Sequence, residues 1–160
     1  MNKNLIKIFL SWILVFIWMI VIFNLSNMNN EESNTQSKDI LDKVVDTTID
    51  TSNKIGIITE TISSNERKII INNLNEPLRN SMHFIIFFIL SIFVLNAINQ
   101  HNIKYKYLIT LIICFVYAIT DEYHQTLVTG RTGEFIDVII DLLGTLTLLT
   151  IYKLYKKYKK

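Results

Sequence analysis

One polar motif interrupts the apolar C-terminal half of the sequence and carries residues that could do chemistry. It reads D-E-Y-H-Q, from Asp121 to Gln125. Asp121, His124 and Gln125 are spaced i, i+3 and i+4 and share one helical face, whereas Glu122 points about 100° away. A carboxylate beside an imidazole could be an acid–base pair or half of a metal site. D-x-x-H alone is a weak signal for either.

A second polar motif places acids where a membrane helix should have none. Asp137 and Asp141 are four residues apart, and Gly144 continues the same stripe without a side chain. An ionisable group inside the hydrocarbon is costly, so it normally faces the bundle interior and has a partner or a task. The candidate partners of Asp141 are His83 and Arg131. Binding of a phosphate or carboxylate by the arginine fork and an internal ion pair remain equal alternatives for Arg131.

The composition is that of a small integral membrane protein, which must hold these motifs in helices. Half of the 160 residues are apolar, with 4 Gly, 1 Pro and 1 Cys, unlike a soluble, disordered or fibrous protein. One Cys excludes an internal disulfide framework and a zinc site built on several thiolates. Any metal would need imidazole and carboxylate ligands, for which Asp121 and His124 are weak candidates. We therefore expect no metal and no cofactor.

Four apolar segments have about the length that crosses a membrane, roughly 20 residues. They run from Leu5 to Leu25, Met82 to Ile98, Tyr107 to Gln125 and Phe135 to Tyr152. The first is too long for the apolar part of a typical signal peptide, and no small-x-small cleavage site follows it, so we expect a retained anchor. The predicted fold class is an all-α membrane protein with four transmembrane helices.

The placement of charge predicts the orientation of these helices. Nine lysines and no acid occupy the N-terminus, the loop after the second span and the C-terminal tail, and all 14 acids lie between Glu31 and Asp141. The positive-inside rule then puts both termini in the cytoplasm. Seven ionisable residues consequently fall at the outer face: His83, Asp121, Glu122, His124, Arg131, Asp137 and Asp141.

The segment between the first two spans, residues 26–81, is expected outside the membrane. Apolar residues at helical spacing from Ile40 to Ile49 and from Ile70 to Leu78 predict amphipathic helices that lie on the bilayer or cap the bundle, or simply connect the spans. We expect a break between Asn72 and Pro77, because proline starts helices and does not continue them. The predicted organisation is a first span at residues 1–25, this segment, a core of three spans at residues 79–153 and a basic tail at residues 154–160.

The polar motifs, in this order, resemble the VanZ-like family of bacterial integral membrane proteins. The resemblance rests on R-N-S-M-H-F from Arg79, D-E-Y-H-Q from Asp121, V-x-G-R ending at Arg131 and D-V-I-I-D-x-x-G from Asp137. It implies a multi-pass protein of the bacterial cytoplasmic (plasma) membrane. It also implies a link to low-level resistance to teicoplanin, a lipoglycopeptide antibiotic that targets cell-wall precursors outside the membrane.

Three functions are compatible with these observations, and the sequence leaves open whether the protein is an enzyme. The leading hypothesis is a polar outer-leaflet cavity that handles an envelope lipid or cell-wall precursor, with His83, Gln125 and Arg131 binding the ligand. The second is a membrane-embedded hydrolase or transferase acting on a phospholipid or polyprenyl head group. The third is a structural or partner-binding protein with a buried ion network. The expected partner is the lipid bilayer and not nucleic acid. The catalytic candidates are Asp121, Glu122, His124, Asp137 and Asp141.

Overall fold

The computed structural model describes residues 3–54, 63–101 and 103–159, and these residues form five α-helices and no strand. The prediction of an all-α protein is therefore confirmed. The helices are α1 (Lys3–Ser26), α2 (Asn30–Lys54), α3 (Ser64–Asn99), α4 (Lys106–Gln125) and α5 (Phe135–Tyr158).

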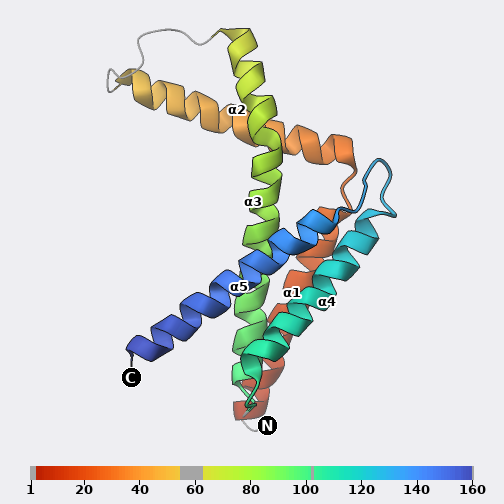
Figure 1. The fold of residues 1–160 in the computed structure, drawn as a ribbon, viewed down its shortest axis with the longest axis vertical. Helices are drawn as coiled ribbons and strands as arrows, with labels where there is room; N and C mark the ends of the chain where they lie inside the picture. Colours follow the sequence, from red (N-terminus) through yellow and green to blue (C-terminus); the bar gives the residue numbers. More distant parts are fainter. Residues whose placement is uncertain (1–2, 55–62, 102, 160) are drawn as a thin grey trace.

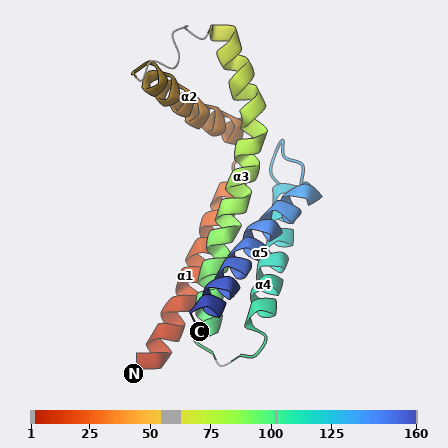
Figure 2. The same ribbon diagram turned by 60° about the vertical axis from the view of Figure 1, so that its left-hand side comes forward.

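Helices α1, α4, α5 and the second half of α3 form a bundle (Figure 1). Within it α3 contacts each of the other three helices, and α4 contacts α1 and α5. Figure 2 shows both ends of the chain and the α3–α4 connection at one end of the bundle, with the α4–α5 loop at the other end. The two chain ends and the α3–α4 connection therefore lie at the end of the bundle opposite the α4–α5 loop.

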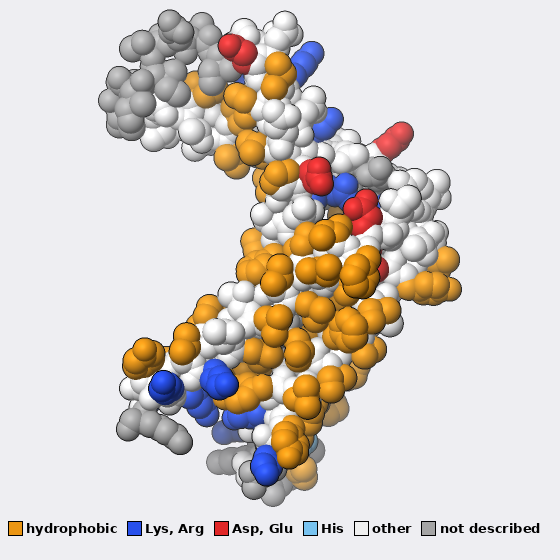
Figure 3. All heavy atoms as spheres, in the orientation of Figure 1, with side chains coloured by type: hydrophobic (Ala, Val, Ile, Leu, Met, Phe, Trp, Pro, Cys, Tyr) orange, Lys and Arg blue, Asp and Glu red, His pale blue; other side chains and the backbone are white. Residues whose placement is uncertain are grey.

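Three helices are long and apolar enough to cross a membrane: Asn4–Ser26, Ser64–Asn99 and Phe135–Tyr158. Helix α4 has the length of a span, 20 residues, but the polar residues of its last turns lower its mean hydropathy. Large apolar side chains are exposed along α1, α4 and α5, and Figure 3 shows them covering the visible face of the bundle, with Lys and Arg side chains at its lower end. Such a surface suits a lipid bilayer, and the chain is a membrane protein.

Helix α3 is continuous through Pro77, so the predicted break between Asn72 and Pro77 is wrong. Pro77 has no N–H and leaves the carbonyl of Asn73 without its usual helical donor, but Asn73 is exposed and water can bind that carbonyl. The helix begins with a capping box between Ser63 and Glu66. It then packs against α2 before the proline and against the bundle after it. The stabilisation from packing before and after Pro77 therefore exceeds the cost of the one missing backbone hydrogen bond.

Helix α2 packs against the first half of α3, outside the bundle (Figure 1); we call α2 and residues 64–78 of α3 the outer arm. Leu41 and Val45 are buried against Ile71. The guanidinium of Arg67 donates to Asp42 of α2 at 2.8 Å. Part of each amphipathic face therefore packs against the other, while Ile40, Val44, Ile69 and Leu74 remain exposed. Residues 55–62 of the predicted segment lie outside the described residues.

Close packing of α5 on α3 positions the first of the polar residues. Gly144 approaches α3 so tightly that a Cβ atom there would collide with the carbonyl oxygen of Phe84. Asp141 lies about one turn before Gly144, and His83 immediately precedes Phe84. The absence of a side chain at residue 144 therefore brings Asp141 against His83.

Candidate functional site

The predicted polar residues meet at the end of the bundle from which the outer arm extends. There α1 and α4 end, α5 begins, and α3 passes from the outer arm into the bundle (Figure 1). The side chains of Asp121, Glu122, Gln125 and Asp141 are all buried. Sequence reasoning predicted this gathering of residues, and the contacts below show which of them meet.

His83 and Asp141 are partners. Nδ1 of His83 lies 3.2 Å from Oδ1 of Asp141, and Asp141 is 0 % exposed. Its second oxygen, Oδ2, is buried without a hydrogen-bond partner. Of the two partners that the sequence offered for Asp141, the structure selects His83 and not Arg131.

Asp121 ties α4 to α1. Its Oδ2 atom accepts hydrogen bonds from the Ser26 hydroxyl at 2.9 Å and from the Gln125 side-chain amide at 3.2 Å. Ser26 is the last residue of α1, so this contact fixes where α1 ends relative to α4. Gln125 acts here as a donor that holds carboxylates.

Glu122 leaves α4 on another face than Asp121 but is buried all the same, because the α4–α5 loop folds back over it. Its Oε2 atom accepts the backbone N–H of Glu134 at 2.8 Å, and Oε1 accepts from Gln125 at 3.1 Å. Glu134 is the N-cap of α5. Glu122 therefore also binds one of the backbone donors at the start of that helix.

His124 takes a different environment from the carboxylates. Its ring stacks on Phe23 of α1, with ring centroids 4.2 Å apart, and its Nε2 atom is buried without a partner. The three ligand atoms that come together instead belong to His83, Asp121 and Glu122, within 4.8 Å of one another. The imidazole nearest these two carboxylates is therefore that of His83, whereas sequence spacing suggested His124.

Arg131, in the α4–α5 loop, reaches across to the start of the outer arm. Its guanidinium donates to the Ser26 carbonyl and to the Ser33 hydroxyl, both at 3.1 Å. The preceding Gly130 has a φ of 78°, a conformation that glycine adopts without strain and that turns the loop inward. Within the described parts of the chain Arg131 forms no ion pair with Asp137 or with any other acid.

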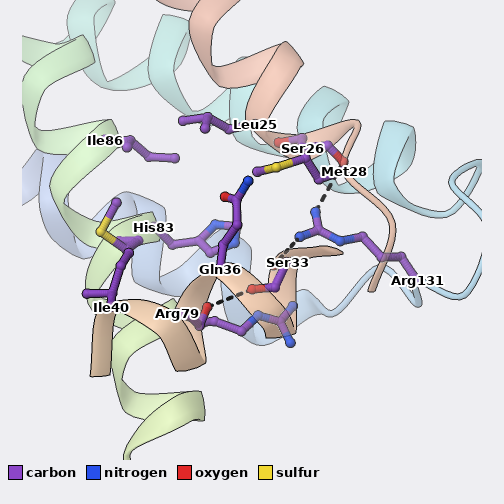
Figure 4. A pocket seen from close by; sticks show the side chains of 12 residues that line it. Leu25, Ser26, Met28, Ser33, Gln36, Ile40, Arg79, His83, Ile86 and Arg131 are labelled. Carbon is purple, nitrogen blue, oxygen red and sulfur yellow. Dashed lines mark hydrogen bonds between the residues drawn. The ribbon is translucent and has the colours of Figure 1, made fainter. Parts of the chain in front are cut away.

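Two arginines share one cavity beneath the outer arm. Figure 4 shows Arg79 and Arg131 lining it from α3 and from the α4–α5 loop, with His83 between the apolar and polar parts of the wall. Burial and the neighbouring guanidinium of Arg79 lower the pKa of Arg131. The lining residues include no carboxylate. The apolar part of the wall is made by Leu25, Met28, Ile40, Met82 and Ile86.

A second cavity adjoins the first on the side of the α4–α5 loop. Arg79, His83 and Arg131 line both cavities, and the second also has three acids in its wall, namely Glu76, Glu134 and Asp137. Asp137 thus lies beside the polar opening and not in the buried group around Asp141. The first cavity is cationic and partly apolar, and the second is polar with both signs of charge.

Sequence reasoning missed two serines of this site and gave Arg79 no role. Ser26 contacts both Asp121 and Arg131, and Ser33 contacts Arg131. Ser26 closes an otherwise apolar helix, which is a weak signal for a polar contact. Ser33 lies in an asparagine- and serine-rich stretch where nothing distinguishes it. Arg79 stood in one of the motifs.

Comparison with known proteins gives a match to a protein family. The model of a family described as VanZ/LLP1 matches residues 10–156, and this range includes every residue of the site. No curated protein and no solved structure matches the chain.

Proposed function

The chain belongs to the VanZ/LLP1 family, and we propose that it binds the anionic head group of an envelope lipid or a cell-wall precursor at the outer side of the bacterial plasma membrane. The observation that carries this proposal is the cavity lined by Arg79 and Arg131 and by no carboxylate. A phosphate accepts the forked hydrogen bonds of guanidinium groups. Both arginines lack an ion-pair partner in the described residues.

The apolar wall of the same cavity favours an amphiphile over free phosphate. Leu25, Met82 and Ile86 line it on the bundle side, and Met28 and Ile40 line it on the side of the outer arm. A head group between the arginines would therefore leave its acyl or polyprenyl chain against apolar residues. Leu25 and Met82 also adjoin the lipid-facing surface, since Leu25 is 38 % and Met82 is 44 % exposed.

The proposal includes a topology of four spans with both termini in the cytoplasm. Helix α4 lies beside three longer apolar helices, and its polar last turns face buried partners instead of lipid. The acid-free lysine clusters belong to the end of the bundle that holds both termini (Figure 2). The positive-inside rule assigns that end to the cytoplasm, and the arginine cavity then opens to the outer leaflet.

The lipids that copurify with the protein test this proposal. Protein extracted in mild detergent from bacterial membranes should carry a phosphate-bearing lipid that mass spectrometry identifies. Arg131→Gln should lower the bound amount about tenfold, since a hydrogen bond to a charged group is worth roughly 1.5–3 kcal/mol. Lys104→Gln, at the opposite end of the bundle, is the matched control. Equal lipid in the Arg131 variant and the control would contradict the proposal.

The family resemblance extends the proposal to teicoplanin. If the bound molecule belongs to cell-wall synthesis, expression in a susceptible host should raise the inhibitory concentration of teicoplanin and leave that of vancomycin unchanged. Arg131→Gln, at an equal membrane level, should lose the effect. If this variant and the wild type raise the inhibitory concentration of teicoplanin equally, the cavity has no part in the effect on the antibiotic.

A further inference from the structure

Beside the arginine cavity lies a group of potential metal ligands that head-group binding does not use. One ring nitrogen of His83 and one oxygen each of Asp121 and Glu122 lie within 4.8 Å of one another. Asp121 is 3 % exposed and Glu122 is 6 % exposed. These ligand atoms come from two helices, so tertiary packing brings them together.

Few protein cations oppose the charges of this group. Asp141 adds a third buried carboxylate, and its basic contact is His83. Arg131 interacts electrostatically with Asp121 and Glu122, but its guanidinium hydrogen-bonds to Ser26 and Ser33 instead. Across residues 3–54, 63–101 and 103–159, no lysine or arginine forms an ion pair with any of the three acids. Burying carboxylates without a compensating charge is expensive. A divalent cation would supply that charge at the point where the ligand atoms converge.

The contact between His83 and Asp141 has the arrangement of a metal-bound histidine with an orienting carboxylate. A histidine that binds a metal through one nitrogen commonly donates its other N–H to a carboxylate. Because Nδ1 of His83 faces Asp141, Nε2 is the nitrogen that remains for a metal. The Oδ2 atom of Asp141, on a residue that is 0 % exposed, has no hydrogen-bond partner. This unpaired buried oxygen does not belong to the group of His83, Asp121 and Glu122, and it is a second observation that favours a bound ligand beside His83.

Hydrogen bonds hold the two ligand carboxylates in place and leave acceptor sites free. Asp121 accepts hydrogen bonds from Ser26 and Gln125 through Oδ2, and among the described residues no hydrogen bond reaches its Oδ1 atom. Each oxygen of Glu122 accepts one hydrogen bond and keeps a further lone pair. Both carboxylates are thus oriented before any ion arrives.

We propose that His83, Asp121 and Glu122 bind a divalent transition-metal ion, Mn²⁺ or Zn²⁺, with Asp141 orienting the imidazole. Imidazole together with carboxylates and without thiolates suits these ions, and the imidazole disfavours Mg²⁺ and Ca²⁺. The inference does not rest on the proposed head-group binding, since neither arginine is a ligand. A metal here would add positive charge at the wall that His83 shares with the arginine cavity.

Metal titration of the full-length protein tests this inference. The protein, purified with a tag that contains no histidine and stripped with a chelator, is titrated with Mn²⁺ while electron paramagnetic resonance follows the free ion. Elemental analysis after incubation with Zn²⁺ gives the stoichiometry. We expect one ion per chain. We expect His83→Ala and Asp121→Asn to weaken binding at least tenfold, and Asp141→Asn to weaken it about 10- to 100-fold, as for other orienting partners.

The matched controls are the two other histidines, His124 and His101. His124→Ala, on the same helix as the carboxylates, and His101→Ala, exposed at the opposite end, should bind as the wild type does. Binding well below one ion per wild-type chain would overturn the inference whatever the variants do. Loss in His124→Ala with retention in His83→Ala would overturn it as well. Arg131→Gln should keep the metal, so failure of head-group binding and failure of metal binding are distinguishable.

Discussion

Nδ1 of His83, on α3, lies 3.2 Å from Oδ1 of Asp141, on α5, at a point where Asp141 is completely buried. This contact joins two helices that cross in the middle of the molecule (Figure 1). The same contact lies beside the close packing of Gly144 on Phe84 and belongs to the polar site as well. Changes at either residue should therefore alter stability as well as any ligand binding.

Removal of one partner of this pair should destabilise the fold strongly. We expect His83→Ala to cost about 3–5 kcal/mol, because it leaves the Asp141 carboxylate buried without its partner. Thermal unfolding in detergent measures the effect as a lower Tm. Asp137→Asn, one turn away and only partly buried, is the control and should melt close to the wild type. Equal Tm values for the two variants would refute this role of the pair.

A methyl group at Gly144 should separate α5 from α3. Its Cβ would collide with the carbonyl of Phe84, which belongs to the backbone and cannot turn away. We expect Gly144→Ala to cost about 1–3 kcal/mol, the usual range for overpacking. Leu143→Ala, at a neighbouring position that is 50 % exposed, should have little effect on Tm. If both variants unfold at the same temperature, the close approach of the two helices is wrong.

The outer arm should loosen in acid. The hydrogen bond from Arg67 lowers the pKa of Asp46, so the ionised form favours the packed arm. This contribution is present at neutral pH and is lost as the pH falls through the lowered pKa. Spin labels at Thr47 and Lys68, in a Cys114→Ala background, should report a narrow distance distribution at neutral pH and a broader one near pH 3.

Two further variants separate this ion pair from a general effect of acid on the outer arm. Arg67→Met should give the broad distribution already at neutral pH, whereas Asp50→Asn, an exposed acid on the same helix, should behave as the wild type. A distribution that does not change with pH in any variant would show that apolar packing alone holds α2 on α3.

Chemical labelling should place the α4–α5 loop outside the cell. Thr132 and Lys104 are both exposed and lie at opposite ends of the bundle. In a Cys114→Ala background, Thr132→Cys should react with a membrane-impermeant maleimide in intact cells. Lys104→Cys should react only after the cells are opened. The reverse pattern would invert the topology, and reaction of both in intact cells would exclude α4 as a span.

Sequence reasoning found the helices and most of the site because these depend on local patterns. Runs of apolar residues mark the spans, and the spacing of Asp121 and Gln125 correctly indicated that they lie on one face, where they are hydrogen-bonded. Hydropathy alone could not predict the course of α3 through Pro77. That depends on contacts with α2 and with the bundle, which are distant in sequence.

The composition of the site was harder to predict, because it too depends on contacts between residues that are distant in sequence. His124 shares a helix with Asp121, yet it stacks on Phe23, and the imidazole nearest the carboxylates comes from His83 on another helix. The partners of Arg131 are Ser26 and Ser33, about a hundred residues earlier in the chain. Helical spacing describes neighbours on one helix and carries no information about which helix packs opposite.

Lipid selectivity shows whether Arg79 and Arg131 form one site for an anionic head group. We would titrate the purified wild type and the Arg79→Gln/Arg131→Gln double variant with phosphatidylglycerol and with phosphatidylcholine, and compare the ratio of Kd values. We expect the wild type to prefer the anionic lipid at least tenfold, about 1.4 kcal/mol, and the double variant to lose this preference. A double variant with the wild-type ratio, or a wild type without preference, would contradict this expectation.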